Sequence, residues 1–185
     1  MSDVANSDEV LMQRVAGGDQ QALEELVRRY ADRLLTFIHR TVGNRHRAEE
    51  IFQETIFTIW RKSRQYNSNQ PFRPWLYKIA LNGCRVDFRK ARLPTQAMLE
   101  DAVPGESLDD PQAIAAAAES HAAVKEAVAR LPAQQRAVVT MRIWSGLSYA
   151  EIADVVDVAE STVRSYMFHA LTSLRHILSP IVVDD

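Results

Sequence analysis

The sequence predicts an all-α protein made of two small helical domains, and three observations lead to this prediction. Apolar residues recur every three or four positions through most of the chain, and no segment shows the strict alternation typical of a half-buried strand. Residues that favour N-caps, together with glycines, separate the periodic stretches. A central stretch with two prolines, a glycine and no sustained period divides them into two groups. A length of 185 residues has room for two such domains.

Four helices are expected in the first domain, residues 1–92. The periodicity places them at about 8–16, 20–41, 45–64 and 73–91. Their expected N-caps are Asp8, Asp19 and Asn44, and glycines 17, 18 and 43 should end helices. The core faces of the last two helices are predicted to be Ala48, Phe52, Ile56 and Ile59, and Leu76, Ile79, Ala80, Gly83 and Val86.

A linker at 93–111 is expected to join this domain to a second one at 112–185. Helices are predicted there at about 112–130, 133–144, 149–156 and 161–178. Ser148 and Glu151 are spaced as a capping box, and residues 157–159 form the turn after this short helix. Apolar residues then recur on the inner faces of the two helices: Ile152, Ala153, Val155, Val156, Val163, Met167, Ala170, Leu171, Leu174 and Leu178.

A short helix, a tight turn and a longer amphipathic helix form the helix-turn-helix pattern, whose second helix enters the major groove of DNA. The outer face of that second helix presents candidate base-reading and phosphate-binding side chains: Ser161, Thr162, Arg164, Ser165, Phe168 and His169. The alternative is a structural helical hairpin whose polar face is only solvated.

Charge is strongly segregated along the chain, although the net charge is only −2. Residues 61–92 contain nine basic residues and one acid, Asp87, whereas residues 93–124 contain six acids and no lysine or arginine. A basic surface followed by an acidic flexible linker is therefore expected.

Part of the basic block forms one stripe on the predicted fourth helix. Positions at steps of three and four share a helix face, and here they are Trp75, Lys78, Asn82, Arg85, Arg89 and Arg92. Cations, an amide and an indole are what single-stranded nucleic acid requires, for phosphates, base edges and stacking respectively. The preceding loop, 63–72, adds Arg64, Tyr66, Asn67 and Phe72, whose aromatic rings could hold an unstacked base. Alternatively, Phe72 and Trp75 belong to the core and the charges only solvate the helix.

A different kind of surface is predicted on the third helix. Projection at 100° per residue sets five residues opposite its core face, namely Glu50, Gln53, Glu54, Phe57 and Arg61. An aromatic ring among carboxylates is typical of a protein interface with an apolar anchor and a polar rim. Alternatively, Phe57 packs on a neighbouring helix of the same domain.

The sequence contains no catalytic constellation, so an enzyme is not expected. The five histidines lack metal-ligand spacing, no glycine-rich phosphate loop is present, and the single Cys84 lies in the middle of a predicted helix. No cofactor, metal or small-molecule substrate is therefore expected. The acidic N-terminus has no apolar core and no segment is long enough to span a bilayer, so a cytoplasmic protein without membrane insertion is expected.

Three motifs in order resemble the small, two-domain extracytoplasmic-function (ECF) group of bacterial RNA polymerase sigma factors, in the sigma-70 family. The first spans residues 48–57, and the second spans 72–82 with Asp87 and Arg89 following. The third combines Leu131, Pro132 and Arg136 with residues 147–153 and 162–165.

This resemblance implies a transcription initiation factor without catalytic activity of its own. The Glu50–Phe57 face would dock on core RNA polymerase, the loop 63–72 and the stripe would capture the melted -10 element, and the helix from Ser161 would read the duplex -35 element. The linker would run through the polymerase, the nucleoid would be the place of action, and an anti-sigma factor would cover these surfaces.

The sequence also departs from the family pattern. Asp157 and Ala159 replace a usual turn glycine and a frequent serine cap, Tyr166 and His169 replace residues that are often basic, and Arg47 replaces a common acid. Weaker phosphate contact by the second domain is expected, and a less uniform polymerase face. Two rivals remain: a stand-alone helix-turn-helix regulator that binds duplex operators, and a helical adaptor that binds only proteins.

Overall fold

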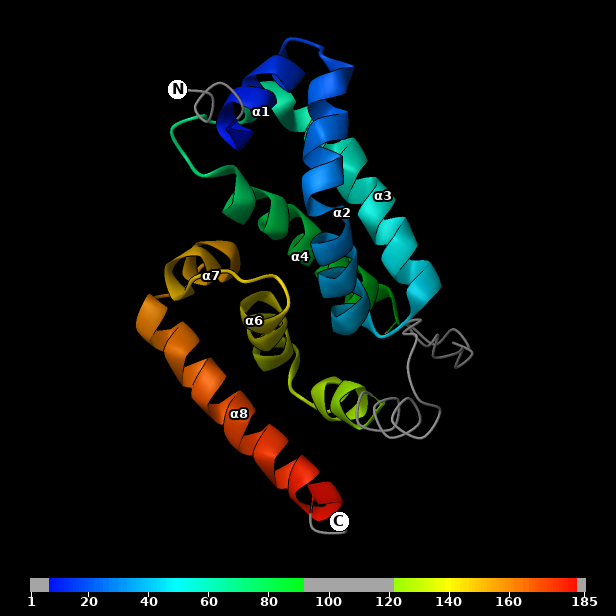
Figure 1. The fold of residues 1–185 in the computed structure, drawn as a ribbon, viewed down its shortest axis with the longest axis vertical. Coiled ribbons are helices and arrows are strands. Elements are labelled where there is room, and N and C mark those ends of the chain that lie inside the picture. Colours follow the sequence, from blue (N-terminus) through cyan, green and yellow to red (C-terminus); the bar gives the residue numbers. More distant parts are fainter. Residues whose placement is uncertain (1–6, 92–121, 183–185) are drawn as a thin grey trace, which may run out of the picture.

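The computed structural model describes residues 7–91 and 122–182, and these residues are helical or in turns, without a strand. Figure 1 shows two groups of helices lying against each other. The first group contains α1 (Asp8–Ala16), α2 (Gln20–Val42), α3 (Arg45–Lys62), the 3₁₀ turn η2 (Ser63–Gln65) and α4 (Phe72–Ala91). The second contains a helix at 122–129, α6 (Ala133–Ile143), α7 (Tyr149–Val156) and α8 (Glu160–Val182). The predicted all-α class with two helical domains is confirmed.

Local capping accounts for most of the helix boundaries. Asp19 and Asn44 accept hydrogen bonds from the backbone N–H groups of Ala22 and Arg47, so both are N-caps as predicted. The prediction for Asp8 is wrong, because Ser7 caps α1 and Asp8 is already its first helical residue. Gly43 ends α2 at φ +79°, a conformation that favours glycine.

The first group buries one side of each helix. The predicted core residues Ala48, Ile59, Leu76 and Ala80 are buried, and Phe52, Ile56 and Ile79 are partly buried against them. The prediction for Val86 is wrong: its side chain is 41% exposed. Gly83 lies where α4 crosses α3, since a Cβ atom there would stand 2.9 Å from Cγ2 of Ile51.

The second group has the helix-turn-helix connectivity that the sequence predicts. Ser148 and Glu151 form the capping box of α7 with both hydrogen bonds present, and Asp157 ends α7 in the left-handed conformation at φ +63°. Val163, Met167 and Ala170 of α8 are buried against α6 and α7. Leu171 does not belong to this inner face, because it is 45% exposed.

The two groups are in contact with each other. α4 packs on α7 and α2 packs on α6, and buried apolar residues of both groups form one contiguous cluster. Figure 1 shows α7 beside the first half of α4 and α8 on the far side of α6. The predicted linker, 93–111, and the start of the predicted helix at 112–130 lie outside the described residues.

Candidate nucleic-acid and protein interfaces

The cationic stripe is a solvent-facing row of side chains on α4. Lys78, Asn82, Arg85 and Arg89 are all exposed, while the opposite side of the helix faces the core. Arg85 Nη1 donates to Asn82 Oδ1 at 3.3 Å, and Arg89 Nε donates to the Arg85 carbonyl oxygen at 3.4 Å. The helix therefore spaces cations and an amide along one line, as a phosphate backbone requires. Arg92, the last predicted member of the stripe, lies outside the described residues.

The single acid of the basic block does not neutralise this row. Asp87 Oδ1 accepts a hydrogen bond from Arg47 Nη1 of α3 at 2.7 Å, and its side chain is only 17% exposed. Arg47 is therefore turned toward α4 rather than toward the carboxylates of α3. The expectation that Arg47 disturbs the face formed by those carboxylates is not met in this structure.

Aromatic side chains gather where η2 and the following loop meet the start of α4. The Tyr66 ring centroid lies 5.0 Å from that of Trp75 and 6.1 Å from that of Phe72. Tyr30 of α2 stacks edge-on against Phe72 at 5.6 Å. Trp75 and Tyr66 are half-buried, so part of each side chain remains exposed to solvent.

Phe72 differs from the role that the sequence suggested for it. Its ring is 1% exposed, in the core between Tyr30, Tyr66 and Trp75, so it offers no stacking surface in this structure. The helix α4 begins at Phe72 itself, whose backbone N–H donates to Glu9 Oε1 at 3.1 Å, and this start turns the side chain inward. Phe72 instead packs against the rings of Tyr66 and Trp75.

The remaining loop residues of the predicted site are exposed. Arg64 lies in η2, and Asn67 faces solvent while its Oδ1 accepts a hydrogen bond from the Asn69 N–H at 3.0 Å. The Tyr66 hydroxyl donates to the Gln70 carbonyl oxygen. Burial first, and then the nearby Glu9 and Asp8 carboxylates, raise the pKa of Tyr66 to about 12, so this hydroxyl stays protonated near neutral pH.

The predicted protein-binding face of α3 is exposed over its whole length. Phe57 is 56% exposed, and its ring is covered only on one side by the Arg61 guanidinium, 5.4 Å from the ring centroid. Packing of Phe57 on a neighbouring helix is thus excluded. Around it lie the exposed side chains of Glu50, Gln53, Glu54 and Arg61. His46 faces Glu50 at 3.4 Å, and Arg61 faces Glu54 at 3.8 Å.

The outer face of α8 is also open. Ser161, Arg164, Ser165, Phe168 and His169 are exposed and Thr162 is half-buried. Phe168 is 67% exposed, with its ring centroid 5.6 Å from that of His169. Arg164 is less free than the sequence suggested. It pairs with Glu160 at 2.5 Å, and its guanidinium stacks 4.6 Å above the Tyr149 ring.

Nothing in the described part of the chain adds catalytic or metal-binding groups. Among these residues no cluster of histidine, cysteine and carboxylate side chains could hold a metal ion. Burial raises the pKa of the Cys84 thiol to about 12, so it is not a nucleophile near neutral pH. Nor does any described helix combine the length and the apolar character needed to cross a bilayer.

Sequence reasoning missed the polar contacts that join the two groups of helices. Arg73 belongs to the basic block but not to the stripe, and its Nη2 donates to the Ser145 carbonyl oxygen. Its Nη1 lies 3.5 Å from Glu151 Oε1. Arg40 stacks over the Trp144 ring at 4.0 Å. The sequence offers one signal for these contacts, namely that Arg73 is a cation outside the stripe. That signal does not identify Ser145, 72 positions further along the chain, as its partner.

Family profiles match both groups of helices. The profile described as "Sigma-70 region 2" matches residues 26–93, and that described as "Sigma-70, region 4" matches residues 121–174. The chain is 30% identical to the RNA polymerase sigma-H factor of Pseudomonas aeruginosa over 184 residues, which covers 95% of both proteins. It is 28% identical to the ECF RNA polymerase sigma-E factor of Haemophilus influenzae, over 95% of this chain and 97% of that protein.

Solved structures share the fold. CnrH, in a complex with the cytosolic domain of CnrY, superposes with a TM-score of 0.74 at 22% identity, over 94% of this chain and 97% of CnrH. The sigma factor RpoE of Bartonella quintana, in a complex with the anti-sigma factor NepR, gives a TM-score of 0.67 at 22% identity, over 88% of this chain and 98% of RpoE.

Proposed function

The chain belongs to the ECF group of the sigma-70 family of RNA polymerase sigma factors, and from this premise we propose that it directs core RNA polymerase to specific promoters. In this proposal α4 and the loop before it capture the -10 element as melted single strand, and α8 reads the -35 element as duplex. The protein adds contacts and specificity to the polymerase and catalyses no reaction itself. Its place of action is the cytoplasm, at the nucleoid.

The exposed stripe of α4 is the observation that carries the proposal. Lys78, Arg85 and Arg89 form a row of cations with Asn82 between them, and the half-buried rings of Trp75 and Tyr66 lie at its start. Cations that follow a backbone, beside aromatic rings on which bases stack, suit single-stranded DNA. Duplex DNA offers no unstacked base to such rings, so this surface favours a melted strand.

The helix-turn-helix supports the second contact. The outer face of α8 offers Ser161, Ser165 and His169 as exposed polar side chains at the start of a helix that follows a tight turn. Because Glu160 pairs with Arg164 and partly offsets its charge, we expect weaker phosphate contact by this face. The affinity of the second contact therefore depends on tethering through the polymerase, which raises the effective concentration of α8 at the promoter.

The exposed face of α3 is the proposed polymerase-binding surface. Phe57 supplies an apolar anchor, and the carboxylates and Arg61 around it supply a charged rim. An anti-sigma factor is the proposed regulator, since the structurally similar RpoE was crystallised with one. Such a partner would compete for these exposed faces.

Run-off transcription with core polymerase on a promoter library tests the proposal. We expect specific transcripts only when this protein is present, from templates that share a -10 and a -35 sequence.

A stand-alone regulator is the second candidate, because the helix-turn-helix is present in full. It requires tight, sequence-specific duplex binding by the isolated protein in a gel shift. Such binding, without any stimulated transcript, would contradict the sigma-factor function.

A further inference from the structure

A cavity of about 70 Å³ lies where the first group of helices faces the second. Its wall is mostly apolar and includes Leu81 and Phe88 of α4, Ala137 and Val138 of α6, and Val156 of α7. Apolar cavities stay dry, and an engineered one of roughly 150 Å³ in another protein binds benzene. A cavity about half as large accommodates a short alkyl chain rather than an aromatic ring.

The buried hydroxyl in this wall already has a partner. Thr41 is 1% exposed, and its Oγ1 donates to the Phe37 carbonyl oxygen at 2.7 Å. The Thr41 carbonyl oxygen accepts a hydrogen bond from Arg136 Nη1 at 3.0 Å. The polar atoms of Thr41 are therefore committed within the protein and do not attract the charged end of a ligand.

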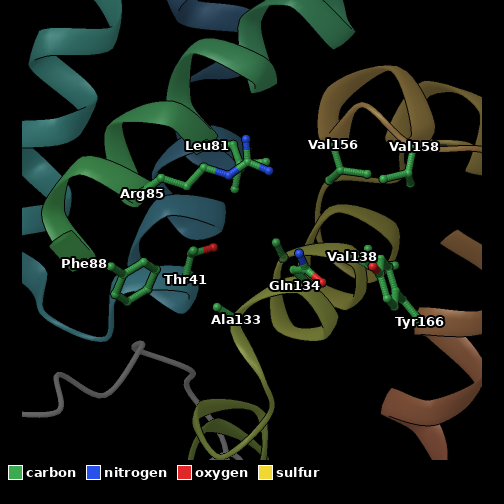
Figure 2. Close-up of a pocket in the computed structure, with 11 residues that line it drawn as sticks. Thr41, Leu81, Arg85, Phe88, Ala133, Gln134, Val138, Val156, Val158 and Tyr166 are labelled. Atoms are coloured by element: carbon green, nitrogen blue, oxygen red, sulfur yellow. The ribbon is translucent and has the colours of Figure 1, made fainter. Parts of the chain in front are cut away.

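The cavity has one charged side chain, that of Arg85. Figure 2 shows its guanidinium extending from α4 toward Val156 of the second group. Arg85 is exposed, and the side chain that it contacts is the neutral amide of Asn82, at 3.3 Å. Among the described residues, no carboxylate lines the cavity or pairs with Arg85. A cation without a counter-charge, at the side of an apolar cavity, fits a ligand with an anionic head and a short apolar tail.

We propose that this cavity binds short-chain aliphatic monocarboxylates, with the alkyl chain among the apolar side chains and the carboxylate paired with Arg85. The planar guanidinium of arginine can donate to both carboxylate oxygens, which selects this head group over other anions. The apolar wall selects against acetate and inorganic anions, because they have little or no apolar surface to bury. Both halves of the ligand thus contribute to its recognition.

Arg85 belongs both to this site and to the cationic stripe of α4. Its guanidinium cannot pair with a carboxylate in the cavity and with a phosphate on the outer face of α4 at the same time. A bound carboxylate should therefore oppose capture of the melted -10 strand. This effect on DNA rests on the proposed function, whereas the carboxylate site itself does not.

Methyl NMR of the full chain during a titration with hexanoate tests the site. Val138, Val156 and Val158 line the cavity, whereas Val15 is buried in α1 and does not. The methyl signals of these four valines therefore report whether a ligand occupies the cavity. Hexan-1-ol and hexylammonium keep the tail of hexanoate and change its head group, and acetate keeps the head group and removes most of the tail.

We expect hexanoate to shift the signals of the three cavity valines saturably, with a dissociation constant of about 1 mM, and to leave Val15 unchanged. Hexan-1-ol and hexylammonium should bind at least about tenfold more weakly, because neither accepts a charge-assisted hydrogen bond from Arg85. Acetate should shift none of these signals. Absence of hexanoate shifts at the cavity valines, or hexylammonium binding as tight as that of hexanoate, would overturn the proposal.

Two variants test the tail and the head of the ligand separately. Ala137→Leu fills the cavity and should abolish hexanoate binding, and Arg85→Gln should weaken it at least about tenfold. Lys90→Gln is the matched control, since it removes an exposed cation from α4 that does not line the cavity, and it should bind hexanoate as wild type does. Circular dichroism verifies the fold, and if A137L loses helix, Ala133→Leu at an exposed position of the wall replaces it. Wild-type affinity in R85Q or in the filled variant would overturn the proposal.

Promoter opening separates this site from the proposed function. With core polymerase and a promoter selected by run-off transcription, saturating hexanoate should slow the exposure of -10 thymines severalfold relative to an equal concentration of acetate. The filled variant should open the promoter at the same rate in both salts. If neither protein opens a promoter in acetate, the proposed function fails, while the NMR titration still decides the carboxylate site. Equal rates in hexanoate and acetate for wild type would overturn the competition at Arg85.

Discussion

At the scale of single residues, Phe57 is the clearest candidate for contact with a partner, because its ring is exposed. Phe57 holds a large aromatic ring 56% exposed on a helix face whose other members are polar. An exposed ring contributes little to folding, because its surface stays in contact with water. On the proposed function, a partner that covers this ring would gain binding energy from it, and the rim of carboxylates and Arg61 would orient that partner.

Replacement of Phe57 by alanine should therefore weaken polymerase binding and leave the fold intact. We expect a loss of about 1–2 kcal/mol in the free energy of binding, as for an interface anchor. Titration of labelled protein with core polymerase measures it. Val86→Ala is the matched control, since it also removes an exposed apolar group, but on α4. A large drop in thermal stability of F57A would show that the residue supports the core instead.

Asp157 is the second informative residue, because it is the one non-glycine with positive φ in the described part of the chain. Left-handed backbone is disfavoured for residues with a Cβ atom and free for glycine. Asp157→Gly should raise the free energy of unfolding by about 0.5–1 kcal/mol, measured by urea denaturation. Asp157→Ala should lower it, since alanine lacks the short polar chain that tolerates this conformation. Equal stability of all three proteins would contradict the backbone argument.

At the scale of helices, the ends of each helix and the neighbours that cover it determine which side chains are exposed. The helix bounds were largely predictable because caps are local signals, as Asp19, Asn44 and Ser148 illustrate. Burial was less predictable, because an apolar face is covered only where another helix lies across it. Val86 and Leu171 continue the apolar periodicity into turns that no neighbour covers fully, and both are exposed. The sequence places Phe72 in the loop before the helix, whereas α4 begins at Phe72 and buries its side chain.

Arg136 of α6 joins the ends of three elements. Its guanidinium donates to the carbonyl oxygens of Ala129 and Leu131, at 2.5 and 3.0 Å, and to that of Thr41 in α2 at 3.0 Å. Burial lowers the pKa of this guanidinium, yet it stays charged at neutral pH. A charged fork is well suited to several backbone acceptors at once.

Arg136→Ala should lower the free energy of unfolding by about 2 kcal/mol, because it leaves these carbonyl groups, two of them in partly buried contacts, without their charged donor. Urea denaturation followed by circular dichroism measures the change. Arg136→Lys should recover only part of it, since an ammonium group cannot reproduce the fork. If R136A were as stable as wild type, water would satisfy these carbonyl groups equally well.

On the scale of the whole molecule, charge is segregated along the chain and the two groups of helices pack against each other. The basic block and the acidic block that follows it nearly cancel, and the net charge of −2 leaves little general attraction for DNA. The stripe was predictable because it depends on spacing within one helix. The contacts that close the molecule were not, because they join residues 72 and 95 positions apart, and no periodicity records such a pair.

The central claim is that this protein opens promoters through the cationic stripe of α4, on core polymerase. Permanganate footprinting of unpaired thymines tests it most directly, on a promoter selected in the run-off assay. Wild-type protein with polymerase should expose thymines in the -10 element, whereas Lys78→Ala, Arg85→Ala and Arg89→Ala combined should not, although polymerase is still bound. Alanines at Arg14, Arg28 and Arg130, exposed cations outside α4, are the matched control and should open the promoter normally. An unchanged footprint with the α4 triple variant would contradict the account.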